Sequence, residues 1–246
     1  MKMEIFENAE LLGKAAGSLA AETIKKTIEA KGEANIILAT GTSQFHVLEL
    51  ITNDKEIDWS KVTMFHLDEY IGIPITHKAS FRKYLMERFV KKISGLKSYH
   101  LIDGENNPIA ECKRLNAIIC NVQIDLALVG IGENGHLAFN DPPADFETTD
   151  PYIIVDLDEA CRKQQWGEGW FANMDEVPKK AISMSIHQIM QSNMIICSVP
   201  DERKAKAVSD CLNGPVSNIH PASILQNHPN CNIYLDQHAA ALLKNK

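Results

Sequence analysis

The residues best suited to proton transfer lie in and after a glycine-rich segment, Gly130-Ile131-Gly132-Glu133-Asn134-Gly135-His136. An imidazole can take and give a proton near neutral pH, and the carboxylate of Asp141 stands five residues beyond His136. The glycines match the Gly-x-Gly-x-x-Gly pattern of dinucleotide sites, which also requires a helix directly after the last glycine. Pro142 and Pro143 leave no room for a long helix there, so we reject a nicotinamide cofactor. The pattern instead favours a cleft in which the backbone and His136 approach a substrate.

A second pair of ionisable groups, Asp68 and Glu69, follows the apolar run 62–66. Adjacent carboxylates beyond a strand can supply a general base, and they can equally be solvated side chains of a loop. His66 and Asp68 are of the types that bind metals, but no third ligand stands at close spacing. We therefore expect no metal site.

Two further segments have the features of a phosphate site. Thr40-Gly41-Thr42-Ser43 joins an apolar run to a predicted helix, where free N–H groups and hydroxyls can hold an anion. Lys204 stands beside Arg203 in the first turn of another predicted helix, where a cation opposes the helix dipole unless an anion compensates it. An ordinary helix cap is the alternative for the first segment, and solvated surface is the alternative for the second.

Apolar runs alternate with helical periodicity along the chain, which indicates a parallel sheet covered by helices on both faces. We expect an α/β fold of three layers, with a mostly parallel twisted sheet in a modified Rossmann-like arrangement, formed by residues 1–246 as a single domain. In such sheets the ligand site lies beyond the carboxyl ends of the strands, where the loops carrying these residues meet. The expected strands are 35–39, 62–66, 124–129, 152–155, 181–185, 194–199 and 232–235, and the expected helices are 8–30, 44–51, 80–89, 108–120, 202–212 and 239–243.

The composition excludes several classes of protein. The chain has 246 residues, 45% of them hydrophobic and 23% charged, which is typical of a globular protein and excludes a disordered chain. Its net charge of −7 and the lack of a dense Lys/Arg cluster argue against nucleic acid as a partner. No apolar run is long enough to cross a membrane, and the six cysteines are scattered, as is usual for reduced thiols. We expect a cytoplasmic protein, and a homo-oligomer is compatible with the sequence.

Taken in chain order, these segments resemble the glucosamine-6-phosphate deaminase/isomerase family over nearly the whole chain. The glycine-rich segment is the specific part of the resemblance, and the other stretches are individually weak. The matching stretches are residues 38–43, 67–72, 130–142, 177–183, 204–205 and 221–229.

The resemblance implies an aldose–ketose isomerisation coupled to deamination, in which glucosamine 6-phosphate and water give fructose 6-phosphate and ammonia. It implies that the enzyme needs no metal or organic cofactor, and that its partner is a small phosphorylated amino sugar. By resemblance, Asp68 moves the proton between C2 and C1, and His136 opens the sugar ring with the help of Asn134 and Asp141. The phosphate would bind to the loop Thr40 to Ser43 and to Lys204.

Two departures from the family pattern lie near these residues. The family usually has a glutamate where this chain has Asp141, and it usually carries a phosphate-binding arginine in the stretch 155–177, where residues 161–171 do not align with it. We interpret the glycines of that stretch as those of a flexible lid, and we expect Arg162 or Lys163 to replace the missing arginine. A surface loop with buried tryptophans is the alternative.

Three other functions compete with this interpretation. A 6-phosphogluconolactonase typically has Asp-Glu-Arg in place of Asp68-Glu69-Tyr70 and Asp-Gly-His-Thr in place of Asn134-Gly135-His136-Leu137, so both positions favour the deaminase/isomerase. An isomerase/deaminase for another hexosamine 6-phosphate, such as galactosamine 6-phosphate, stays open. A non-catalytic sugar-phosphate sensor would have no use for the proton-transfer groups Asp68 and His136.

Overall fold

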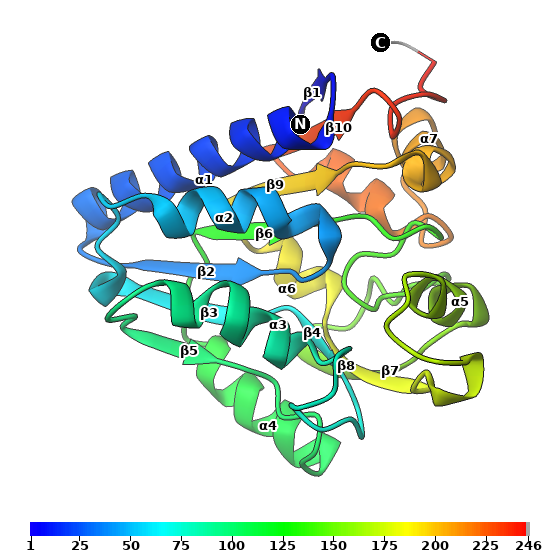
Figure 1. Cartoon of the computed structure of the whole chain (residues 1–246), viewed down its shortest axis with the longest axis horizontal. Coiled ribbons are helices and arrows are strands. Elements are labelled where there is room, and N and C mark those ends of the chain that lie inside the picture. The colour runs from blue at the N-terminus through cyan, green and yellow to red at the C-terminus, as the bar shows by residue number, and fades with distance from the viewer. Residues whose placement is uncertain (245–246) are drawn as a thin grey trace.

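The computed structural model describes residues 1–244 and is built around a sheet of seven strands, each parallel to its neighbours (Figure 1). The order across the sheet is β1-β10-β9-β6-β2-β3-β5. Within the described residues, no helix is both long and apolar enough to span a membrane. The strands are β1 (Lys2–Phe6), β2 (Ala34–Leu38), β3 (Val62–His66), β5 (Ser98–His100), β6 (Leu126–Val129), β9 (Met194–Val199) and β10 (Cys231–Asp236).

Helices cover both faces of this sheet because its central strands are apolar on both faces. Along β2, Ile36 and Leu38 pack in the core of one face, whereas Ile37 packs in the core of the other. The first face carries α1 (Ala9–Lys31), α2 (Phe45–Asn53) and α3 (Phe81–Arg88), and the second carries α4 (Pro108–Ile119), α6 (Ile186–Met190) and α7 (Ala205–Asn213). This arrangement confirms the predicted three-layer α/β fold.

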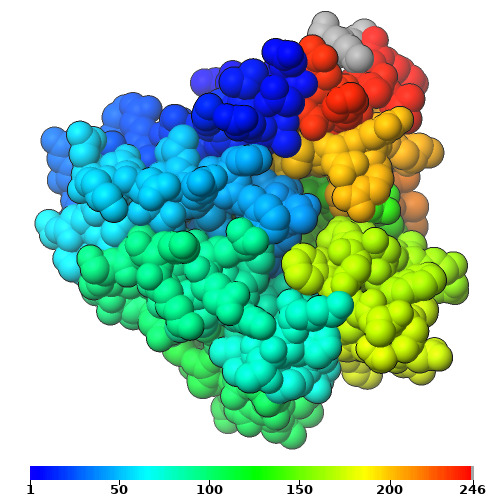
Figure 2. All heavy atoms as spheres, in the orientation of Figure 1, coloured from blue at the N-terminus to red at the C-terminus, as the bar shows by residue number. Residues whose placement is uncertain are grey.

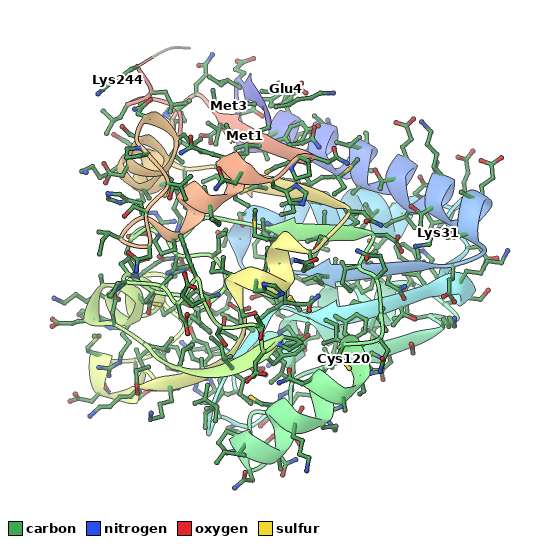
Figure 3. The ribbon with its side chains drawn as sticks, turned by 180° about the vertical axis from the view of Figure 1, so that it is seen from behind. Met1, Met3, Glu4, Lys31, Cys120 and Lys244 are labelled. Carbon is green, nitrogen blue, oxygen red and sulfur yellow. The ribbon has the colours of Figure 1, made fainter. Side chains whose placement is uncertain are left out.

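One of the two edges of the large sheet is formed by β1, and the other by β5. β1 pairs in parallel with β10, in a register that sets Lys2 beside Asn232 and Phe6 beside Asp236. Met3 and Glu4 lie on this edge strand, next to the N-terminal end of α1 (Figure 3). The residues that flank α1 are typical helix caps. Asn8 accepts a hydrogen bond from the N–H of Leu11 at the start of the helix, and Gly32 ends the helix with a φ of 84°.

A second sheet of three antiparallel strands lies beside the first, in the order β4-β8-β7. It contains residues 152–155 and 181–184 of the predicted strands 152–155 and 181–185, so the prediction that these belong to the parallel sheet is wrong. The physical reason is visible in β7, where half-buried residues alternate with the exposed Ile154 and Asp156 beyond the buried Tyr152, as in an antiparallel sheet with one solvated face. The expected helix 239–243 is a run of turns. The strands of the second sheet are β4 (Asp68–Tyr70), β7 (Tyr152–Asp156) and β8 (Lys180–Met184).

The chain crosses directly from the large sheet to the small one at Leu67. The N–H of Leu67 donates to the carbonyl of Leu38 in β2, at 3.2 Å, and its own carbonyl accepts from the N–H of Met184 in β8, at 2.8 Å. One residue is therefore bonded to both sheets. This crossing fixes Asp68 at their junction, just beyond the carboxyl end of β3.

Glu69 joins the small sheet to the start of α3. Its fully buried carboxylate accepts hydrogen bonds from the N–H groups of Tyr70, Phe81 and Arg82 and from the hydroxyl of Ser80. The guanidinium of Arg82, which is also buried, lies 3.5 Å from the same carboxylate. Glu69 therefore caps α3 from another element and compensates a buried cation.

We expect Glu69→Ala to lower the free energy of unfolding by about 3–5 kcal/mol, because it leaves three backbone N–H groups and the hydroxyl of Ser80 without their buried acceptor. Urea unfolding measures this loss. Glu105→Ala is the matched control, since Glu105 pairs with the same guanidinium but its side chain is 47% exposed. The control should lose about 1 kcal/mol or less. Equal losses would show that the buried cap does not hold α3.

Candidate active site

A cleft of about 270 Å³ opens where the loops after β2, β3, β6 and β9 converge, at the edge of the large sheet predicted to carry the ligand site. In the space-filling view the surface is hollowed where the light-blue segment near residue 45, the yellow-green segment near residue 165 and the orange segment near residue 205 approach one another (Figure 2). The polar residues that line the cleft include Thr40, Thr42, Ser43, Asp68, Lys78, Arg88, His136, Gln164, Glu168, Arg203 and Lys204.

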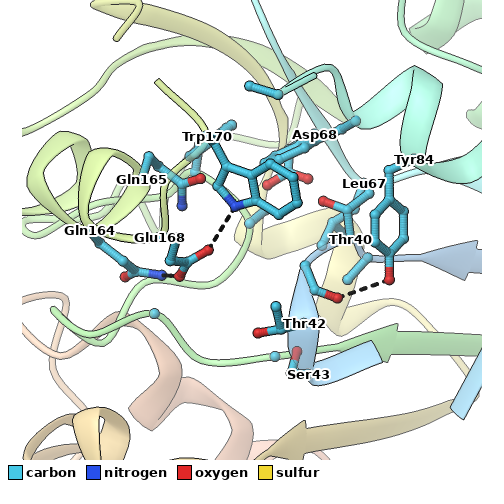
Figure 4. A pocket seen from close by; sticks show the side chains of 18 of the residues that line it. Thr40, Thr42, Ser43, Leu67, Asp68, Tyr84, Gln164, Gln165, Glu168 and Trp170 are labelled. Carbon is cyan, nitrogen blue, oxygen red and sulfur yellow. Dashed lines mark hydrogen bonds between the residues drawn. The ribbon is translucent and has the colours of Figure 1, made fainter. Parts of the chain in front are cut away.

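Asp68 lines this cleft from the first residue of β4 (Figure 4). Its side chain is almost completely buried, and no other described residue donates a hydrogen bond to its carboxylate. Burial, together with the neighbouring charge of Glu69, raises the pKa of Asp68 to about 8. Glu69 does not line the cleft because it faces α3. Of the two adjacent carboxylates, Asp68 thus faces the cleft without a hydrogen-bond donor among the described residues, whereas Glu69 is bonded to α3.

His136 and Asp141 form a hydrogen-bonded pair, with 3.0 Å between Nδ1 and Oδ1. Asn134 donates from Nδ2 to the same oxygen of Asp141, at 2.9 Å, and accepts from the N–H of His136. Burial raises the pKa of Asp141, but the hydrogen bonds from His136 and Asn134 outweigh it, so that the pKa is lowered. The carboxylate therefore stays ionised, and the shorter aspartate reaches the imidazole without the extra methylene of a glutamate.

Within the glycine-rich turn, Gly132 packs directly against the imidazole of His136. A Cβ atom on Gly132 would lie 2.2 Å from Nε2 of His136, a distance that no side chain tolerates. Because Nδ1 is held by Asp141, Nε2 is the ring nitrogen left for a ligand in the cleft that His136 lines. The middle glycine of the Gly-x-Gly-x-x-Gly match is therefore required by the packing of a histidine.

The helix α5 (Glu159–Gly167) is anchored to the same pair. The second carboxylate oxygen of Asp141 accepts from the N–H of Asp158, at 2.9 Å, and Asp158 caps α5 by accepting from the N–H of Cys161. Sequence reasoning predicted a flexible lid here and missed the helix, because its interior carries no apolar periodicity and its end is marked by two glycines. A change in the position of α5 would therefore also move the partner of His136.

The residues predicted to bind phosphate meet in the cleft, except for the two on α5. The loop Thr40 to Ser43 leads into the first turn before α2, and Lys204 lies at the start of α7. Lys204 is half-buried, and within residues 1–244 no carboxylate forms an ion pair with it. Burial lowers the pKa of Lys204. Such a cation is stabilised by an anionic ligand.

Arg162 and Lys163 do not reach the cleft, which corrects the expectation that one of them replaces a phosphate-binding arginine. The guanidinium of Arg162 instead donates hydrogen bonds to the backbone carbonyls of Met174 and Val177, which follow α5 in the chain. Lys163 points to solvent and pairs with Glu159 one turn earlier.

Other cations, missed by sequence reasoning, lie at the mouth of the cleft. Lys78 and Arg88 line it, and the guanidinium of Arg88 lies 3.8 Å over the ring of Phe45. Both residues are exposed, and α3 has the polar face of an ordinary surface helix, so nothing in the sequence distinguishes them.

One group in the described chain brings metal-binding atoms together, namely His136, Asp141 and Cys161, whose ligand atoms lie within 4.8 Å of one another. The imidazole and the carboxylate are already hydrogen-bonded to each other, and burial raises the pKa of the Cys161 thiol. A metal would need the thiolate and would have to break that hydrogen bond. The arrangement favours proton transfer over metal binding.

Comparison with known proteins agrees with this geometry. Residues 7–233 match the sequence model of a family described as glucosamine-6-phosphate isomerases/6-phosphogluconolactonase. The chain belongs to this family. The match includes all four strand-end loops that converge on the cleft.

Relatives within the family divide by function. The chain is 38% identical to a glucosamine-6-phosphate deaminase of Lactobacillus delbrueckii subsp. bulgaricus, over 99% of this chain and 100% of the relative. It is 35% identical to the same enzyme of Oenococcus oeni, over the full length of both. The solved structure of a monomeric glucosamine-6-phosphate deaminase superposes with a TM-score of 0.88 at 31% identity, over 98% of this chain and 100% of the other. A 6-phosphogluconolactonase of Trypanosoma brucei gives a TM-score of 0.80 at 15% identity, over 98% and 97%, which reflects a shared fold.

The raised pKa of Asp68 predicts that this residue lowers stability at neutral and alkaline pH. Between about pH 4, where an aspartate ionises in the unfolded chain, and about pH 8, the folded state holds a proton that the unfolded state has lost, so stability falls as pH rises. Asp68→Asn, which cannot ionise, should unfold at a higher temperature than the parent at pH 8 and at nearly the same temperature at pH 4.5.

Thermal unfolding at the two pH values measures the difference. Asp156→Asn is the control, because that side chain is 80% exposed and should show a much smaller change. An Asp68→Asn variant less stable than the parent at pH 8 would contradict an uncompensated buried carboxyl group.

Proposed function

We propose that this chain is a glucosamine-6-phosphate deaminase, which converts glucosamine 6-phosphate and water to fructose 6-phosphate and ammonia. The observation that carries the proposal is one cleft lined by a free carboxyl group, Asp68, an imidazole–carboxylate pair, His136 and Asp141, and a cation without a partner among the described residues, Lys204. The names of the relatives that match over the whole chain support the same activity.

Ring opening is assigned to His136. The sugar binds as a ring, and opening it requires a proton to leave the hydroxyl on C1 and a proton to reach the ring oxygen. The Nε2 atom of His136 can do both in turn, while Asp141 holds the ring orientation and stabilises the charged form. Asn134 fixes Asp141 in this position.

Isomerisation is assigned to Asp68. In the open chain its carboxylate removes the proton from C2, and the resulting enolamine takes a proton at C1, which leaves an imine at C2. Addition of water to the imine then yields the ketone and ammonia. The raised pKa of Asp68 makes its ionised form a stronger base than an exposed aspartate.

The phosphate end is assigned to the loop Thr40 to Ser43 and to Lys204. N–H groups before a helix and the hydroxyls of Thr42 and Ser43 are suited to phosphate oxygens, and Lys204 supplies a charge. Binding of a dianion would also favour the charged form of Lys204, whose pKa burial lowers.

The lactonase alternative is disfavoured by Tyr70. Lactonases typically carry an arginine at this position, whereas the Tyr70 side chain is fully buried and donates its hydroxyl hydrogen to Gln165, at 2.7 Å. Position 70 therefore supplies no cation that could contact a ligand. A sensor is disfavoured because burial of Asp68 without a partner is unfavourable and contributes nothing to binding an anion.

Ammonia release over a panel of glucosamine, galactosamine and mannosamine 6-phosphates tests the proposal. We expect turnover of glucosamine 6-phosphate, and Asp68→Asn should lower it by about 10²–10⁴-fold through loss of the general base. Asp156→Asn should keep full activity. A parent chain that prefers another hexosamine phosphate, or that hydrolyses 6-phosphogluconolactone, would replace the proposed substrate or reaction.

Lys204→Ala should raise KM for the phosphosugar by about 10- to 100-fold, as expected for a charge-assisted contact worth about 1.5–3 kcal/mol. Lys163→Ala is the matched control, since it removes the same charge from a position outside the main cleft. Steady-state kinetics of the two variants measure the contrast. Similar KM values in both would remove Lys204 from the phosphate site.

A further inference from the structure

The carboxylate of Glu168 faces the cleft from the turn after α5 (Figure 4). Glu168 accepts hydrogen bonds from Nε2 of Gln164, at 2.9 Å, and from the indole N–H of Trp170, at 3.1 Å. Both donors are neutral, and no cation of the described residues forms an ion pair with Glu168. The mechanism assigned above does not use this oriented negative charge.

The charge of Glu168 is not needed to hold the turn in place. The carbonyl of Gly169 accepts a hydrogen bond from Nζ of Lys78, and the buried ring of Phe171 packs against Tyr70 and His77. A glutamine at position 168 could accept a hydrogen bond with its neutral carbonyl. The negative charge therefore calls for another explanation.

The position of Glu168 is unfavourable for a ligand that carries phosphate alone. Its negative charge acts on Lys204, the cation assigned to the phosphate end, and on the neighbouring Arg203, since the carboxylate opposes the effect of burial on the pKa of Lys204 and raises that of Arg203. A carboxylate so placed repels a phosphate dianion. Such an arrangement helps binding only when the same ligand also carries a positive charge.

An amino-sugar phosphate is a ligand of this kind, with a phosphate on C6 and an ammonium group on C2. A hydroxyl at C2 could be recognised by a neutral amide, without repulsion of the phosphate. The cleft is small, so a hexose phosphate that reaches from Lys204 to Asp68 passes within it beside Glu168. A charged acceptor is thus suited to the ammonium group.

We propose that Glu168 binds the ammonium group of the substrate and so selects amino-sugar phosphates over neutral sugar phosphates. This assignment rests on the proposed function and deepens it. Fructose 6-phosphate has no ammonium group, so the product loses the attraction and keeps the repulsion. Glu168 therefore acts as a specificity residue that also favours release of the product.

Two open-chain alcohols that cannot react test this role, namely 2-amino-2-deoxyglucitol 6-phosphate and glucitol 6-phosphate. Calorimetry at pH 7 gives the Kd of each for the parent and for Glu168→Gln. We expect the variant to bind the amino alcohol at least about 10-fold more weakly, as for loss of one charge-assisted contact, and to bind the neutral alcohol as well as the parent does or better. Glu87→Gln removes an exposed carboxylate from the same cleft and should leave the ratio of the two Kd values unchanged.

A second variant, Trp170→Phe, tests whether the orientation of Glu168 matters for binding. Trp170→Phe removes one of the two donors that orient Glu168 and keeps an aromatic ring, so its effect on the ratio of Kd values should lie between those of the parent and Glu168→Gln. Thermal unfolding of each variant shows that it is folded. An equal rise in Kd for both alcohols would show that Glu168 only maintains the conformation of the turn. Unchanged Kd values for both would show that Glu168 does not contact the ligand. Either result overturns the proposal.

The outcomes for Glu168 and for the proposed function are distinguishable. Ammonia release by the parent chain, together with an unchanged ratio in Glu168→Gln, overturns the ammonium contact and leaves the deaminase standing. A ratio that depends on Glu168 in a parent chain that releases no ammonia supports the ammonium contact and overturns the deaminase.

Discussion

The burial of two adjacent carboxyl groups at the junction of two sheets is the constraint on which the site depends. Successive side chains of a strand point to opposite faces, so Glu69 faces α3 and Asp68 faces the cleft. Glu69 is compensated by backbone N–H groups and by Arg82, whereas Asp68 has no such partners and its pKa is raised. Such an uncompensated group is rarely tolerated by a fold unless it acts on a ligand.

The glycine-rich turn and α5 behave as one structural unit because both are bonded to Asp141. One oxygen of Asp141 holds the imidazole of His136, and the other holds the N–H of Asp158 at the start of α5. The turn after α5 then carries Glu168 to the cleft. The orientation of His136 and the position of Glu168, to which we assign ring opening and substrate selection, are therefore both linked to the carboxylate of Asp141.

The parallel sheet could be predicted because its strands are unbroken apolar runs, such as Ile36–Leu38, which are buried on both faces. The small sheet could not, since β4 is three residues long and begins with two acids. For the site, chain order was enough to bring Asp68, His136 and Lys204 to one cleft, because parallel strands end at the same edge. The directions of Arg162 and Lys163 depend on the rotation of α5 about its axis, which the sequence does not specify.

The parallel pairing of β1 with β10 has a consequence for how the molecule is made. Residues 2–6 are synthesised more than 200 residues before Cys231–Asp236, the strand that pairs with them in the described part of the chain. Until that strand has been synthesised, β1 has unpaired N–H and carbonyl groups and half-buried Ile5 and Phe6, as does any strand that waits for its neighbour. This edge of the sheet can therefore close only after Cys231–Asp236 has been synthesised, and until then β1 is open to pairing with a strand of a second chain.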